Sequence, residues 1–481
     1  MNGTLQVAAA PAGPLVSAEP VRHHWVAGAL VIMAAVLLAA SVAVFLTTPL
    51  ASLPRYFVQR YLVLDPTSLL FLLVVNAVFL GISVYMFSRV RTSRVLARNL
   101  VSRASLTAGF MVAMNLGLMS NNLLILWAFV ELTTLCLAPL VAQGDARDPR
   151  LVGWQYLLYS SLSLALTFLG FLCLTRSAAL HGGTISFALD QLAATLPAAG
   201  DSWRRLGLAL MLFGLGSKLG LAPLYGWLPK TYEAAPTSTS ALLAAVQFNI
   251  SVVAVFRILQ VFRGTDIGFV SYELLIMGCL SLTVASVQIM AATNYKRLIA
   301  YACVSSSGII AIGLSVGKAA AYGVVLYVVT NAFVKAILFL TAGRLRAVYG
   351  TNEVSALSGV IRVLPFSGLL FTVGVFALLG FPPFASFTAE MLILSGIVQT
   401  GNLMAFTLMC ALLTVGFVAT GRSIFPMLWG PSERSGPSIR EPLVTAIPKL
   451  GFAFILVGLG IYTPESVSDL LQRVAQSIGG G

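Results

Sequence analysis

Long apolar runs separated by short polar segments dominate the chain. A helix needs about 20 mostly apolar residues to cross ~30 Å of hydrocarbon. Windows of this kind predict thirteen membrane spans, at residues 25–47, 67–88, 105–120, 122–142, 154–175, 204–234, 237–260, 270–292, 296–315, 320–343, 364–398, 403–421 and 447–463. The third span is short. The pattern therefore predicts an all-α polytopic membrane protein with about 13–14 transmembrane helices.

Two of these spans, 204–234 and 364–398, carry residues that interrupt a helix. In the first, Lys218 lies among small and apolar residues and Pro223 follows it. In the second, Gly380 and two prolines precede Glu390. A proline removes a backbone donor and clashes with the preceding turn, so each helix is expected to open locally. The predicted broken-helix residues are Pro223, Pro229, Pro382 and Pro383.

The two breaks fall five spans apart, which is an odd number. The two halves therefore run through the membrane in opposite directions, and inverted repeats with broken helices are typical of transport folds. We expect a flexible N-terminal lead at 1–24, N-terminal transmembrane helices at 25–104, inverted repeats at 105–260 and 270–421, and a C-terminal helix and tail at 447–481.

Composition and charge agree with a membrane protein. Hydrophobic residues make up 58% of the chain and charged residues only 9%, which excludes an ordinary soluble domain. The net charge of +13 comes from arginines in short segments between apolar runs, so it indicates topology and not nucleic-acid binding. The loop that holds Arg89 to Arg103 is then cytoplasmic, and alternation places Lys296, Arg344, Arg422 and Lys449 on the same side. We expect a multi-pass protein of the cytoplasmic (inner) membrane.

Metal and redox chemistry are not expected within this chain. Its five cysteines occur singly, there is no Cys-x-x-Cys pair, and it has only three histidines. Iron–sulfur, haem and zinc sites are therefore unexpected, the loops are too short for a cofactor-binding fold, and no cofactor and no active site are predicted. The loop 177–203 has room for one short helix.

Few ionisable residues lie deep in the predicted spans, namely Glu131, Lys218, Lys335 and Glu390, with Arg257 near a span end. Charges in hydrocarbon are costly, so each is a candidate functional residue. Glu131 is either protonated or paired with a cation, and two carboxylates with two lysines are typical of a proton relay.

Simpler interpretations remain open for each of these residues. For Glu131 and Lys218 the alternative is a static ion pair that only fixes helix packing. For Lys335, expected to be less buried than Lys218, the alternative is a side chain that extends to the interface, and for Glu390 it is a cap on its half-helix. Arg257 is expected to be an interfacial anchor.

Several stretches resemble the antiporter-like subunits of respiratory complex I, over about residues 105–425. They are Trp127 to Glu131, Lys218 to Pro229, Ala235 to Leu243, Tyr295 to Tyr301, Lys335 to Leu340 and Gly380 to Phe384. Glu390 and the residues from Thr133 to Pro139 most resemble component F of hydrogenase-4 and related membrane-bound hydrogenases.

This resemblance implies two inverted five-helix units and a switching ion pair between Glu131 and Lys218, with Glu390 on the exit side. It also implies partners: other membrane subunits of a hydrogenase-like or complex I-like assembly, and a peripheral redox module that supplies the driving reaction.

The chain departs from the family pattern where the family carries intramembrane histidines. Tyr225, Ala244, Ser306 and Asn331 stand at histidine positions. Lys230 replaces an aspartate and Asn249 replaces a lysine. The polar axis between the halves therefore depends on Asn249, Ser306, Asn331 and Lys335.

These features lead to one main hypothesis, a proton-translocating subunit of a redox-driven membrane complex. One alternative keeps the fold but couples cation flux to inorganic-carbon uptake or to sodium/proton antiport. The other is a structural subunit that has lost transport, which the absent histidines allow.

Overall fold

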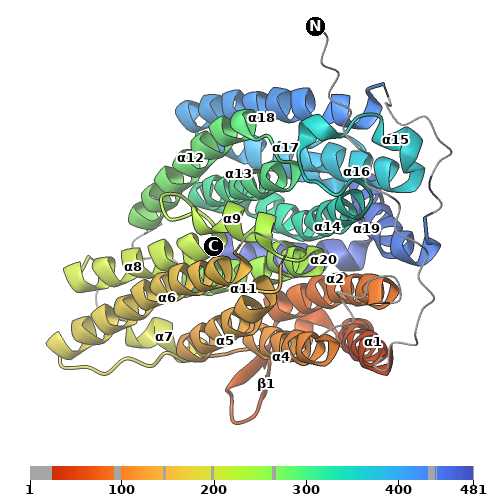
Figure 1. The fold of residues 1–481 in the computed structure, drawn as a ribbon. Coiled ribbons are helices and arrows are strands. Elements are labelled where there is room, and N and C mark those ends of the chain that lie inside the picture. Colours follow the sequence, from red (N-terminus) through yellow and green to blue (C-terminus); the bar gives the residue numbers. More distant parts are fainter. Residues whose placement is uncertain are drawn as a thin grey trace, which may run out of the picture.

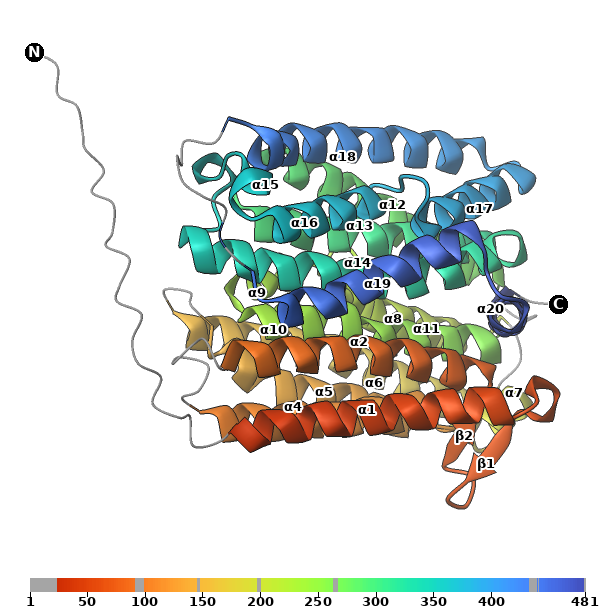
Figure 2. The same ribbon diagram turned by 90° about the vertical axis from the view of Figure 1, so that its right-hand side faces the viewer.

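The computed structural model describes residues 24–90, 99–144, 148–196, 200–262, 267–431, 439 and 441–479. Long helices lie side by side in one bundle (Figure 1, Figure 2). Short elements lie at its two ends in Figure 2, with α15 (Val360–Val363) at one end. The other end has the antiparallel strands β1 (Arg55–Phe57) and β2 (Leu62–Leu64), and the helices α7 (Leu189–Thr195) and α20 (Glu465–Gly479).

The remaining elements follow in three groups. The N-terminal group is α1 (His24–Thr47), η1 (Leu50–Ser52) and α2 (Pro66–Val90). The first half is α4 (Leu100–Leu118), α5 (Leu123–Val141), α6 (Pro149–Leu180), α8 (Ser202–Leu219), α9 (Trp227–Ala234), α10 (Thr237–Ala241), the π-helical η2 (Leu242–Gln247) and α11 (Phe248–Val261). The second half is α12 (Ile267–Ala291), α13 (Tyr295–Val316), α14 (Lys318–Tyr349), η3 (Val354–Ala356), α16 (Pro365–Leu378), α17 (Ala385–Gln399) and α18 (Leu403–Trp429), and α19 (Leu443–Ile461) then leads to α20.

Ten helices within the described residues are long and apolar enough to cross a membrane. They correspond to ten of the predicted spans. The other predicted spans are α4 and the two broken pairs, α8 with α9 and α16 with α17. The helical polytopic fold is therefore confirmed. The predicted lead, apart from His24, lies outside the described residues.

The two halves have related packing. Helix α6 packs on α8, and α14 packs on α16 and α17. The last helix of each half returns to the first, α11 to α4 and α18 to α12. In Figure 1, α14 lies between the two halves, and every residue of its most apolar window is buried. The inverted relation of the halves remains a prediction, which these shared contacts support.

Asparagines begin equivalent helices in the two halves. The Asn122 Oδ1 accepts the backbone N–H of Leu124 at 2.9 Å at the start of α5. The Asn294 Oδ1 accepts that of Lys296 at 2.9 Å at the start of α13. A side-chain acceptor at this position satisfies a backbone donor that the first helical turn leaves free.

Glycines allow one helix pair in each half to approach closely. A Cβ on Gly170 of α6 would lie 2.6 Å from the Gly207 carbonyl oxygen of α8, and one on Gly207 would lie 2.8 Å from the Gly170 oxygen. Gly278 of α12 and Gly308 of α13 form a second reciprocal pair, at 2.9 and 2.8 Å. Small residues at helix crossings are common in membrane bundles.

The C-terminal part differs from the sequence-based picture. Lys449, which the charge pattern placed with the loop arginines, is instead buried in α19, where its charge interacts with Glu441 and Arg344. The predicted tail contains α20, whose apolar face is buried. This helix is too polar on average to appear in a search for apolar windows.

Arg257 is not an interfacial anchor, because it forms a buried ion pair with Asp65, which precedes α2. The Arg257 Nη1 and the Asp65 Oδ2 are 2.5 Å apart, and Nη2 donates to Oδ1 at 2.9 Å. Burial alone would raise the pKa of Asp65, but the charge and hydrogen bonds of Arg257 outweigh burial and hold that pKa below its usual value. The pair fastens α2 to α11.

We predict that Arg257→Leu destabilises the protein by about 3–5 kcal/mol, because it leaves the Asp65 carboxylate buried without its cation. Thermal unfolding of the purified protein, followed by loss of the monodisperse chromatographic peak, measures the effect. The control is Arg473→Leu, which removes an exposed i,i+4 pair with Asp469 and is expected to cost less than about 1 kcal/mol. Equal losses in the two variants would contradict the prediction.

Candidate functional site

Helix α8 ends just after Lys218, as the sequence predicts, and the chain resumes as α9 at Trp227. Gly220 takes a left-handed backbone conformation, with φ +83°, which a side chain would strain. Pro223 lies in the connection between the helices, and Pro229 is buried in α9. The first predicted break is therefore present.

Side chains of the second half satisfy the backbone groups that this break frees. The Ser307 Oγ of α13 donates to the Leu219 carbonyl oxygen at 2.7 Å. The Ala222 N–H donates to the Ser281 Oγ of α12 at 2.7 Å. Opened backbone is tolerated at membrane depth only where protein or water satisfies it. Neither serine was predicted from the sequence, because only the fold brings them to the break.

Lys218 is buried beside the break, with 4% of its surface exposed. Its Nζ donates to the Thr134 Oγ1 of α5 at 2.5 Å. The same Nζ lies 5.3 Å from the centre of the Tyr156 ring of α6. An ammonium over an aromatic face is stabilised by the ring's negative charge density. The lysine therefore points into the bundle and not toward an interface.

Glu131 lies one helical turn from the threonine that binds Lys218. Its Oε1 accepts the Ser161 Oγ of α6 at 2.6 Å, and its Oε2 is buried with no hydrogen-bond partner in the described part of the chain. No direct ion pair between Glu131 and Lys218 occurs among the described residues. The structure thus places the predicted pair in a separated arrangement.

Two hydrogen bonds next to this site connect α6, η2 and α5 of the first half. The Tyr156 hydroxyl donates to the Gln247 Oε1 at 2.8 Å. The Gln247 Nε2 donates to the Thr133 Oγ1 at 3.2 Å. Gln247 is the last residue of the π-helical turn η2 and was missed from the sequence, although a lone glutamine in an apolar run was a signal.

The next polar groups lie at the junction of the halves. The Asn249 Nδ2 donates to the Ala245 oxygen at 2.8 Å, while its Oδ1 is buried and unpartnered in the described residues. The Lys335 Nζ lies 3.6 Å from the centre of the Phe248 ring and likewise has no described hydrogen-bond partner. Lys335 is 1% exposed, so the expectation that it is less buried than Lys218 is wrong. The reason is that α14 is enclosed on all sides.

The second break brings Glu390 against the opened backbone. Gly380 has φ +64°, and a Cβ there would overlap the Glu390 carboxylate. Pro382 and Pro383 are exposed in the connection between α16 and α17. The Ser386 Oγ donates to the Ala377 carbonyl oxygen at 2.5 Å, so this break is satisfied from within its own segment.

A cavity of about 50 Å³ lies beside Glu390. Among its lining residues are Ser306 and Tyr327, which interact with each other. Tyr327, Asn331 and Lys335 follow each other at four-residue spacing in α14, so they share one face of that helix. That spacing is visible in the sequence. Tyr327 was nevertheless missed, because the prediction considered only Asp, Glu, Lys and Arg residues and the positions where the family has histidine.

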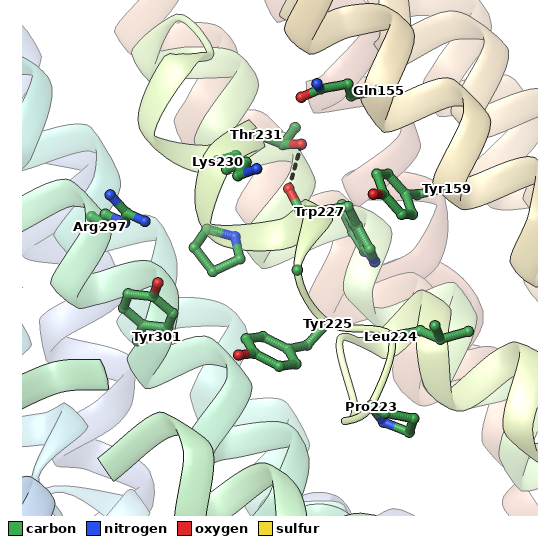
Figure 3. Close-up of a pocket in the computed structure, with 12 residues that line it drawn as sticks. Gln155, Tyr159, Pro223, Leu224, Tyr225, Trp227, Lys230, Thr231, Arg297 and Tyr301 are labelled. Atoms are coloured by element: carbon green, nitrogen blue, oxygen red, sulfur yellow. Dashed lines mark hydrogen bonds between the residues drawn. The ribbon is translucent and has the colours of Figure 1, made fainter. Parts of the chain in front are cut away.

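A second cavity, of about 350 Å³, opens beside the first break and is shown in Figure 3. Trp227 lies in its wall and packs against Tyr156 with ring centres 5.5 Å apart. One aromatic layer therefore separates this cavity from Lys218.

One further buried carboxyl lies outside the predicted site. Glu273 of α12 was missed as an intramembrane carboxyl, and its Oε2 is buried and unpartnered among the described residues. Within the same residues, no group of three or more His, Cys, Asp or Glu side chains is arranged to hold a metal ion.

The described residues thus group the predicted site into two clusters. Glu131 and Lys218 form one, and Lys335, Asn331, Ser306 and Glu390 form the other. The Phe248 ring lies against Lys335 of the second cluster. No unbroken chain of direct hydrogen bonds joins the clusters in the described part of the molecule.

Comparison with known proteins shows the family of the chain. Residues 120–416 match the transmembrane family described as NADH:quinone oxidoreductase/Mrp antiporter. The chain is 26% identical over 426 residues to a hydrogenase-4 component F homolog of Methylacidiphilum infernorum, covering 86% of this chain and 88% of the relative. It is 29% identical over 371 residues to NADH-quinone oxidoreductase subunit N of Desulforudis audaxviator, covering 73% and 72%.

A solved structure shares the fold. A chain of the membrane-bound sulfane sulfur reductase, an archaeal respiratory membrane complex, superposes with a TM-score of 0.83 at 22% identity, over 94% of this chain and 92% of that one. These relatives are subunits of multi-subunit membrane complexes. The chain is therefore a multi-pass membrane protein that belongs to the NADH:quinone oxidoreductase/Mrp antiporter family of antiporter-like membrane subunits.

Proposed function

We propose that this chain is a proton-translocating subunit of a redox-driven membrane complex of the hydrogenase-4 or complex I type. It has no active site of its own and needs partner subunits to supply the driving reaction. The observation that carries the proposal is the separated pair: Lys218 donates to Thr134, Glu131 accepts from Ser161, and Thr134 lies one helical turn from Glu131 on α5.

Lys218 and the half-buried Glu131 carry opposite charges but make no direct ion pair among the described residues, so the strength of their interaction can change when either side chain moves. The attraction between unit charges about 4 Å apart is ~4 kcal/mol at an effective dielectric constant of 20. Contact between Glu131 and Lys218 therefore stabilises the charged lysine by about a thousandfold relative to full separation. Movement of the Glu131 carboxyl away from Lys218 favours release of the Lys218 proton.

The proton released by Lys218 passes to water and then to Lys335, on the far side of the Phe248 ring. From there it moves along the face of α14 formed by Asn331 and Tyr327 to the cavity at Glu390. Transfer past the Phe248 ring takes place through water that enters beside it. Asn249, with its free Oδ1, is placed to bind that water.

We predict that Lys218→Ala lowers proton translocation by about a hundredfold, a loss typical of removing a positioned proton-transfer group. Proton uptake into vesicles that contain the reconstituted complex measures it. Lys318→Ala is the control, because that lysine is exposed at the start of α14. Unchanged flux in correctly assembled Lys218→Ala would refute the relay.

Glu131→Gln tests the structural alternative in the same assay, since it keeps the size and the Ser161 contact of the side chain. Loss of flux with normal assembly supports the relay. Normal flux in this variant, together with loss of the complex when the whole chain is deleted, would make the subunit a scaffold.

We predict that Glu390→Gln blocks release and lowers flux by at least about tenfold, because the amide cannot carry the proton. Glu273→Gln is the control, since it neutralises another carboxyl of the second half, half-buried and outside the path. The measurement is the proton flux of each variant relative to the wild type. A larger loss in Glu273→Gln than in Glu390→Gln would contradict the assigned path.

The driving reaction is tested by purifying the intact complex from native membranes and identifying its subunits. We predict hydrogenase-like or quinone-reducing subunits beside other membrane subunits. A single large zinc protein would favour inorganic-carbon uptake, and a set of small membrane subunits without a redox module would favour sodium/proton antiport.

A further inference from the structure

The cavity beside the first break has an unusual distribution of charge. Lys230 of α9 and Arg297 of α13 both line it, and no carboxylate is among its lining residues. Figure 3 shows Arg297 and Tyr301 on one wall, with Lys230 and Tyr159 on the others. The cavity therefore presents positive charge to whatever occupies it.

Lys230 and Arg297 make no strong ion pair with the described residues. The Arg297 Nε lies 3.9 Å from the Glu233 Oε2, in a pair whose side chains are 44% and 32% exposed, and such pairs contribute little. The Arg297 guanidinium lies 5.8 Å from the centre of the Tyr301 ring. Lys230 is exposed and makes no hydrogen bond or ion pair with the described residues. An anion in the cavity would meet both groups without displacing a strong partner.

Neutral donors complete the lining. The hydroxyls of Tyr159, Tyr225 and Tyr301 point to the cavity region and make no hydrogen bond within the described part of the chain. Phosphate oxygens accept several hydrogen bonds at once, and cations with neutral donors are the usual partners of a phosphate group. The lining thus matches a phosphate better than it matches a single carboxylate.

The surroundings of the cavity indicate where that phosphate comes from. On α6, next to the lining residues Gln155 and Tyr159, the exposed side chains are Trp154 (62%), Leu158 (63%) and Leu162 (52%). Arg297 lies in the first turn of α13, and Pro223 lies in the connection between α8 and α9. The site therefore combines a charged end with an apolar wall. A lipid contacts both, whereas a soluble anion needs only the charged end.

We propose that this cavity binds an anionic phospholipid, with its phosphate between Lys230 and Arg297 and its acyl chains along the exposed face of α6. The tyrosine hydroxyls donate to the phosphate oxygens. The aromatic layer of Trp227 and Tyr156 separates this lipid from Lys218, so the lipid site is distinct from the proton path.

The test compares lipid binding by the full chain in its complex, reconstituted in phosphatidylcholine nanodiscs. Spin-labelled phosphatidylglycerol and spin-labelled phosphatidylcholine are the probes, and the motionally restricted fraction of each gives the selectivity. We predict that Lys230→Gln with Arg297→Gln lowers the preference for phosphatidylglycerol by about fivefold for each cation removed.

The control is Lys318→Gln with Arg362→Gln, which removes two exposed cations away from the cavity. This control is expected to retain the preference. The single variants Lys230→Gln and Arg297→Gln serve if the double variant does not assemble, and each is expected to lose about half of the effect on a logarithmic scale. Proton flux is not the readout, so this proposal and the proposed relay can fail separately.

Three outcomes would overturn the inference. Equal loss in the control pair would make the preference a property of the whole charged surface. Release of the labelled lipid by inorganic phosphate would assign the site to a soluble anion. Cross-linking of Lys230 to an acidic side chain of another subunit in the native complex would show that a protein partner occupies the cavity.

Discussion

Backbone that opens inside a membrane has to find hydrogen-bond partners, and this requirement shapes the whole bundle. At the first break the partners are Ser281 and Ser307, which belong to the other half of the chain. The half that holds Lys218 is therefore fastened to the half that holds Lys335 at the point where the helix is weakest. Any movement of the break is felt by α12 and α13, which gives the two halves a physical connection.

At the second break the hydrogen-bond partner comes from the same segment, where the Ser386 Oγ donates to the Ala377 carbonyl oxygen. Its free space is taken by the Glu390 carboxylate, which packs against Gly380 where no side chain fits. The two breaks are thus similar in sequence and unequal in role. The first connects the halves, and the second holds a carboxyl beside a small cavity.

The ionisable side chains inside the bundle also need partners. Lys218 donates to a threonine hydroxyl, Glu131 accepts from a serine hydroxyl, and Lys335 lies over the face of Phe248, so each of these groups has a neutral partner and none has an opposite charge in contact among the described residues. A static ion pair would have joined Glu131 directly to Lys218 and left neither group available. Arg257 and Asp65 show that this chain also makes such a direct pair, where it fastens α2 to α11.

Hydrophobic length, proline and glycine act locally and charges are rare in hydrocarbon, so the spans, both breaks and four of the intramembrane ionisable residues could be predicted from the sequence, whereas Glu273 and the burial of Lys449 were missed. The tertiary structure determines which groups meet. It separated Glu131 from Lys218, buried Lys335 more deeply than expected, paired Arg257 with Asp65, and brought Ser281 and Ser307 to a break far away along the chain. These contacts join residues many positions apart, and a local sequence pattern does not show which helices pack against each other.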